Sequence, residues 1–117
     1  MKPKDYGDYL NDIFNSICEI EEFVKGMTFS KFVNDRKTVN AVIRSIEVMG
    51  EAAKSIPESF RRKHPNIPWK KMAGMRDKLI HEYFGVDLEI VWKMIGNNLP
   101  ELKISFIRIC KEFENNH

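Results

Sequence analysis

Arg76, His81 and Tyr83 lie within eight residues of one another and combine side chains that suit phosphate chemistry. A guanidinium is a permanent cation whose fork of N–H donors matches the oxygens of a phosphate group. An imidazole gains and loses a proton near neutral pH, so it can serve as a general acid or base. This segment, with its added phenol, is therefore a candidate site for binding and transforming a phosphate ester.

Basic residues surround this segment, although the net charge of the 117-residue chain is only +2. Residues 61–81 contain one acid, Asp77, and seven basic residues: Arg61, Arg62, Lys63, Lys70, Lys71, Arg76 and Lys78. That stretch carries +6, which leaves −4 on the rest of the chain. Lysine and arginine neutralise phosphates in nucleic-acid binding, so the asymmetry favours a polyanionic partner. A solvated helix face would give the same cluster, and charge alone leaves both interpretations open.

The apolar residues follow a helical period throughout, which predicts an all-α protein forming one domain over residues 1–117. Main helices are predicted over 5–25, 34–56, from Pro68 onward, and over 87–112, with short helical turns after Thr28 and over 58–63. Gly26 and Pro57 end the first two, and Asp87 is a natural N-cap for the last. Pro100 is expected to kink or interrupt that last helix. The expected architecture is a compact antiparallel bundle of four main helices.

Small residues lie inside two of these helices: Gly50 with Ala53, and Ala73 with Gly74. Glycine destabilises a helix interior by about 1 kcal/mol relative to alanine, so its presence needs a reason. Close approach of the two helices is the preferred interpretation, and a flexible hinge is the alternative. Close packing would hold Arg76 beside the helix that carries Glu51 and Lys54, and Glu51 could then support it.

Arg76 falls within the apolar stripe formed by Trp69, Met72 and Tyr83, so its guanidinium needs a partner. That partner could be an acid such as Glu51 in an ion pair, or a substrate phosphate in a cleft. His81 follows five residues later, about 140° around a continuous helix. Either the helix ends or deforms before His81, or two chains contribute to one site across a two-fold axis.

The segment 68–87, together with Gly50-Glu51-Ala52-Ala53-Lys54, resembles the HepT branch of the HEPN superfamily, the toxin ribonucleases of prokaryotic toxin–antitoxin pairs. The resemblance extends over roughly residues 39–102. Its signature is arginine, four residues, histidine, any residue and tyrosine, which Arg76, His81 and Tyr83 match. Asp77 agrees with the polar residue that usually follows the arginine. The resemblance implies a HEPN-like helical homodimer in which the motifs of both subunits line one cleft.

Metal-independent endoribonuclease activity is the function that this resemblance implies, with no cofactor. Arg76 and His81 would be catalytic, with His81 as the base and Arg76 stabilising charge on phosphorus. Supporting or RNA-binding residues would be Asp77, Lys78, Glu51, Lys70 and Lys71. The other histidines, His64 and His117, form no recognisable metal-ligand set with the acids near the motif. Tyr83 would accept AMP from a nucleotidyltransferase antitoxin of the MNT type, which silences the enzyme.

Two other functional classes fit parts of the sequence. A non-catalytic HEPN module could bind nucleotide or present substrate to a nucleotidyltransferase, and a plain helical scaffold could serve dimerisation alone. The scaffold would leave the clustered charge and the arginine in the apolar stripe unexplained. We expect a cytoplasmic location without membrane contact, because the N-terminus lacks a signal-peptide core and no apolar run approaches the ~20 residues of a membrane span. Cys18 and Cys110 are expected to be reduced.

Overall fold

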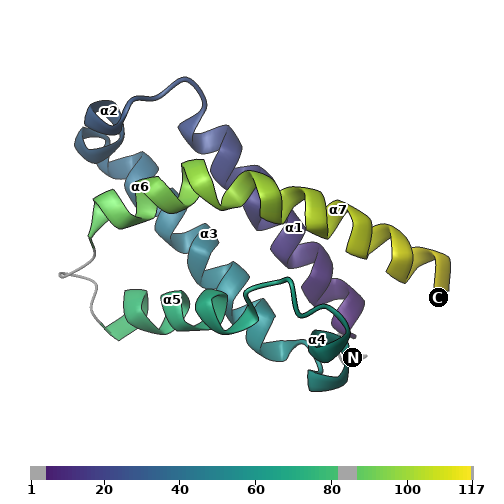
Figure 1. The fold of residues 1–117 in the computed structure, drawn as a ribbon. Coiled ribbons are helices and arrows are strands. Elements are labelled where there is room, and N and C mark those ends of the chain that lie inside the picture. The colour runs from purple at the N-terminus through teal and green to yellow at the C-terminus, as the bar shows by residue number, and fades with distance from the viewer. Residues whose placement is uncertain (1–4, 82–86, 117) are drawn as a thin grey trace.

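The computed structural model describes residues 5–81 and 87–116, and the regular structure in these two ranges is entirely helical (Figure 1). The helices are α1 (Tyr6–Val24), α2 (Phe29–Asn34), α3 (Arg36–Ser55), α4 (Glu58–Lys63), α5 (Trp69–His81), α6 (Leu88–Asn97) and α7 (Leu99–Asn116). The prediction of an all-α helical bundle is thereby confirmed. The predicted boundaries of the first two long helices lie within two residues of those of α1 and α3.

Side-chain caps and breakers account for the ends of these helices. The Asp5 carboxylate accepts a hydrogen bond from the Asp8 backbone N–H at the start of α1, and Asp35 does the same for Thr38 at the start of α3. Gly26 follows α1 with a φ of 74°, a left-handed conformation that glycine adopts without steric cost. Asp87 caps α6 as predicted, with its carboxylate accepting from the N–H groups of Glu89 and Ile90.

The last predicted helix is divided in two at Asn98, between α6 and α7. Pro100 explains the division, because a proline within a continuous helix would lack one backbone hydrogen bond and would clash with the carbonyl four residues earlier. As the second residue of α7, Pro100 instead lies in a first turn, where no N–H is required. In Figure 1, α6 and α7 follow one another along nearly the same line.

α3 is the central helix and packs against α1 on one side and α5 on the other, while α7 packs against α1. The core formed between them contains the fully buried side chains Leu10, Ile13, Ile17, Val42, Ile46 and Phe106. Trp69 links α5 to α7, since its ring lies 5.7 Å from that of Phe106 in an edge-on contact. Its indole N–H donates to the His64 carbonyl oxygen at 3.0 Å. The start of α5 is therefore held firmly to the core.

The prediction of close helix approach is right for Gly50 and wrong for Gly74. A Cβ at Gly50 would overlap the Cβ of Arg76 and come within 2.7 Å of the Met72 carbonyl oxygen. Gly74 has open space where its Cβ would be, so it makes no helix–helix contact. The two glycines differ because α5 presents Met72 and Arg76 to α3, and Gly74 is turned away from that interface.

Two further predictions concern the state of the cysteines and the possibility of a membrane span. Cys18 and Cys110 are both unpaired, as predicted. They come from α1 and α7, and burial raises the pKa of the Cys110 thiol, which keeps it protonated near neutral pH. Within the described residues, none of the helices has the length and apolar character required to cross a membrane.

Candidate active site

Arg76 lies on α5 where that helix meets α3, and its guanidinium is held by two carboxylates. Its Nε lies 3.0 Å from Oε2 of Glu51, and its Nη1 lies 2.9 Å from Oδ1 of Asp77. Glu51 directly follows Gly50, so the close helix contact places the carboxylate beside the arginine stem. The side chain of Arg76 is 25% exposed. It is therefore mostly buried and lies at the edge of the core.

Lys54 completes a chain of four charged side chains on α3 and α5. Its Nζ lies 3.2 Å from Oδ1 of Asp77, the oxygen that also accepts from Arg76. The hydrogen bond from Arg76, followed by that from Lys54, lowers the pKa of Asp77 below its ordinary value. Two cations and two anions alternate along the chain Glu51–Arg76–Asp77–Lys54, so its net charge is zero.

An open pocket of about 230 Å³ lies beside Arg76, at the junction of α1, α3 and α5. It is lined by Tyr9, Asp12, Arg44, Glu47, Val48, Glu51, Ala52 and Arg76. The sequence left two interpretations of Arg76: an ion pair with an acid, or a cation in a cleft. The structure contains the ion pair, but the guanidinium also borders an accessible pocket. Three acids and two arginines line this pocket, so the ion pair of Arg76 coexists with an accessible pocket of mixed charge.

The helix that carries Arg76 is continuous to His81, its last residue. The alternative in which the helix ends before His81 is therefore wrong, and the two positions are separated by about 140° around one axis. The side chains of Lys78 and His81 and the whole of Tyr83 lie outside the described residues. Their roles stay predictions from the sequence.

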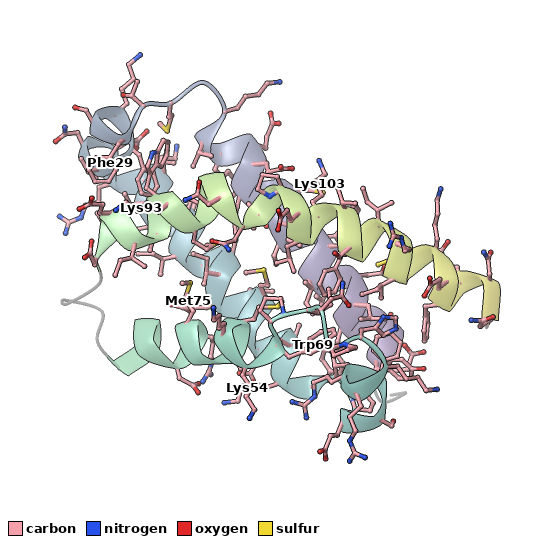
Figure 2. All side chains as sticks on the ribbon, in the orientation of Figure 1. Phe29, Lys54, Trp69, Met75, Lys93 and Lys103 are labelled. Atoms are coloured by element: carbon pink, nitrogen blue, oxygen red, sulfur yellow. The ribbon has the colours of Figure 1, made fainter. Side chains whose placement is uncertain are left out.

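Of the remaining predicted residues, Lys70 and Asp77 are seven positions apart and so lie on nearly the same face of α5, whereas Lys71 lies on another. Asp77 is half exposed and joined to Arg76, whereas Lys70 and Lys71 are exposed near the start of the helix. Lys71 borders a second pocket of about 360 Å³, lined mostly by apolar side chains including Met49, Met72, Met75 and Met94. In the view of Figure 2, Met75 lies on the upper side of α5, whereas Lys54 lies below that helix. Among the described side chains of α5, the basic residues Lys70, Lys71 and Arg76 do not converge on one point.

The sequence pointed to Arg76 and Glu51, and to Lys54 only as a neighbour of Arg76. It did not point to four other polar residues that line the pocket: Tyr9, Asp12, Arg44 and Glu47. A signal was present. Arg44, Glu47, Glu51 and Lys54 recur at intervals of three or four residues, which places them along one side of α3. This pattern looks like an ordinary solvated helix face. Whether these side chains of α3 lie near Arg76 depends on where α5 crosses α3. The spacing of residues within one helix does not reveal that crossing point.

The fold and the charged site are those of a small helical protein with an accessible arginine, and sequence comparison identifies its family. The sequence model of the protein family described as "Ribonuclease HepT-like" matches residues 13–109 of this chain. A relative from Thermococcus cleftensis, named probable ribonuclease HepT, is 50% identical over 108 residues, covering 92% of this chain and 98% of the relative. The chain therefore belongs to the HepT-like ribonuclease family of the HEPN superfamily.

Two further relatives carry similar names. One from Methanocaldococcus jannaschii, named as a candidate RNase, is 46% identical over 114 residues, which cover 97% of this chain and 94% of the relative. One from Caldanaerobacter subterraneus subsp. tengcongensis, also named as a candidate RNase, is 50% identical over 95 residues, covering 81% of this chain and 85% of the relative. Among solved structures, none matches the chain significantly.

Proposed function

We propose that this protein is a metal-independent endoribonuclease and the toxin of a prokaryotic toxin–antitoxin pair, acting in the cytoplasm. The main structural support is the position of Arg76. Its guanidinium is anchored through Nε and Nη1 by Glu51 and Asp77, yet it borders an open pocket. An arginine held in this way can meet a phosphate without first losing much conformational freedom. Because the family is described as ribonucleases, we expect that phosphate to be a phosphodiester of RNA.

In the proposed reaction His81 accepts the proton of a ribose 2′-hydroxyl. The 2′-oxygen then attacks phosphorus, and the bond from phosphorus to the 5′-oxygen of the next nucleotide breaks. Arg76 neutralises the negative charge that develops on the phosphoryl oxygens. The leaving 5′-oxygen takes up a proton from water, which gives a 2′,3′-cyclic phosphate and a 5′-hydroxyl end. DNA lacks the attacking hydroxyl and is expected to be inert.

We further propose that the active unit is a homodimer with a shared site. Arg76 and His81 are about 140° apart on one helix, and α5 contains both positions without a break. One phosphate is difficult to reach from both positions within a single chain. Two chains related by a two-fold axis could contribute Arg76 from one and His81 from the other.

Regulation is proposed to act through Tyr83. An antitoxin nucleotidyltransferase would join the phenol oxygen to the α-phosphorus of ATP, releasing pyrophosphate while the phenolic proton passes to solvent. The modified tyrosine would carry a phosphodiester and a purine only seven residues from Arg76 in the chain. The new negative charge would compete with RNA for the arginine.

A second candidate function is a non-catalytic module that binds nucleotide for a partner transferase. The observation in its favour is that Glu51 and Asp77 already satisfy two N–H donors of Arg76, as expected for an arginine with a structural role. The two functions differ in one testable respect: a nuclease cleaves the RNA that it binds without any partner, whereas the accessory module only binds its ligand.

The deciding experiment incubates purified, unmodified protein with single-stranded RNA in the presence of EDTA. Cleavage that yields 2′,3′-cyclic phosphate ends is expected from the wild type. Arg76→Ala and His81→Ala are expected to abolish cleavage and to keep the helical circular dichroism spectrum. RNA binding without cleavage by the wild type would favour the accessory module, and full activity of His81→Ala would rule out its role as the base.

A further inference from the structure

Lys54 and Arg76 donate hydrogen bonds to the same atom, Oδ1 of Asp77. The Lys54 Nζ lies 3.2 Å from this oxygen, and the Arg76 Nη1 lies 2.9 Å from it. The two cations come from different helices, α3 and α5, and are 22 residues apart in the chain. In Figure 2, Lys54 is labelled on α3 just below α5 in the view. Packing of these helices thus brings two positive side chains onto one negative oxygen.

Two cations that contact one atom repel each other, and an anion between them offsets this repulsion. The Asp77 carboxylate supplies that anion in the structure. A non-bridging phosphate oxygen is also a small anionic acceptor, and charge-assisted bonds from lysine and arginine to phosphate have similar lengths. The position now taken by Oδ1 of Asp77 is therefore suited to an oxygen of a phosphodiester.

The contacts around Asp77 can be exchanged with little rearrangement. Lys54 and Asp77 are 43% and 46% exposed, and ion pairs between exposed side chains contribute little to stability. A phosphodiester carries one negative charge, as does the carboxylate, so the exchange leaves the charge between the two cations unchanged. Glu51 would remain bound to Nε of Arg76 and keep the guanidinium in place.

We propose that Lys54 is a second phosphate-binding residue beside Arg76, and that Asp77 occupies the phosphate position until RNA displaces it. This inference rests on the proposed ribonuclease function and adds two points to it. Lys54 contacts the substrate, and Asp77 competes with the substrate for both cations. Lys54 would therefore strengthen RNA binding at this site, and Asp77 would weaken it.

The test measures binding of a fluorescent, fully 2′-O-methylated oligoribonucleotide by anisotropy at several KCl concentrations. This probe has no free 2′-hydroxyl within the chain and cannot be cleaved by the proposed reaction, so binding is measured separately from activity. Lys54→Met is expected to bind several-fold more weakly and to lower the slope of log K against log salt by about 0.7. Lys54→Arg should restore binding. Asp77→Asn should bind more tightly than the wild type, since an amide competes poorly for two cations.

Lys93→Met is the matched control, because Lys93 is also an exposed lysine paired with an acid, Glu89, at 3.3 Å. It lies on α6, well apart from Lys54 (Figure 2). An equal loss of binding in Lys54→Met and Lys93→Met would reduce Lys54 to general surface charge and overturn the inference. Weaker binding by Asp77→Asn would overturn the role of Asp77 as a competitor. Wild-type binding of the probe with this variant pattern, but without cleavage of ordinary RNA, would keep the phosphate site and reject the nuclease.

Discussion

Gly50 of α3 and Arg76 of α5 are in direct contact, because the missing side chain of Gly50 leaves room for the Cβ of Arg76. The next residue, Glu51, then reaches Nε of the same arginine at 3.0 Å. One glycine therefore allows the two helices to approach, and its neighbour fixes the charged end of the arginine. The backbone position of Arg76 and the orientation of its guanidinium are set by two consecutive residues of α3.

This contact predicts opposite effects for two glycine substitutions. Gly50→Ala should lower the free energy of unfolding by about 1–3 kcal/mol, because the new methyl group would overlap Arg76 and crowd the Met72 carbonyl. Gly74→Ala should raise it by about 0.5–1 kcal/mol, since its Cβ enters open space within a helix. Urea denaturation followed by circular dichroism measures both. Equal stabilisation by the two changes would show that α3 and α5 do not approach closely at Gly50.

The sequence predicted the helices well because their ends carry local signals. Asp5 and Asp87 cap their helices, and Pro100 marks the division between α6 and α7. These effects act over one helical turn and can be inferred from neighbouring residues. Helix starts and stops could therefore be predicted without knowledge of the packing.

The contacts of the site were harder to predict, because they depend on how α5 crosses α3. Gly50 and Gly74 look alike in the sequence, yet only Gly50 lies at the crossing. Glu51 was correctly expected to be able to reach Arg76, since it follows a small residue that permits close packing. The sharing of Asp77 by Lys54 and Arg76 requires the angle and register of both helices. The helical period of either one alone does not contain that information.

A pH-dependent contribution to stability is expected from Asp77. The hydrogen bonds from Arg76 and Lys54 lower its pKa in the folded protein below the ordinary value of 3.8. The stabilisation is therefore complete above that value and is lost as the pH falls through the folded pKa. The wild type should exceed Asp77→Asn in melting temperature by a small margin at neutral pH, and the margin should shrink in acid. Thermal unfolding of both proteins across this range checks the trend.

Asp35 provides a comparison for this measurement. Its pKa is also lowered, chiefly by the hydroxyl of Thr38 within its own helix cap, with no contribution from the Arg76 site. Asp35→Asn should show its own acid dependence, and RNA binding should stay at the wild-type level. A difference between wild type and Asp77→Asn that is constant from neutral pH into acid would contradict the proposed pairing of Asp77.

Subunit complementation tests the shared site. In a dimer formed from one Arg76→Ala chain and one His81→Ala chain, one of the two composite sites retains both side chains. An equal mixture should regain about a quarter of wild-type cleavage, since about half of the dimers are mixed and each has one intact site of two. Native mass spectrometry must confirm that the chains exchange. Exchange without any recovered RNA cleavage would mean that each chain contains its own complete site.

Modification of Tyr83 is the last prediction. If AMP is attached there, its phosphodiester would bring a negative charge and a purine to the segment that follows His81, and the charge would be drawn to the cations Arg76 and Lys54. Co-expression with a cognate nucleotidyltransferase should raise the mass of this chain by whole AMP units that map to Tyr83, and the modified protein should no longer cleave RNA. Tyr83→Phe should stay unmodified and active in the same cells. The control is Tyr6→Phe, whose ring packs against Phe60 and Phe113 and does not line the pocket beside Arg76. This variant retains Tyr83 and should be modified and silenced as the wild type is. Silencing of an active Tyr83→Phe protein, or AMP found on another residue, would replace covalent control at Tyr83 with inhibition by complex formation or by a different acceptor.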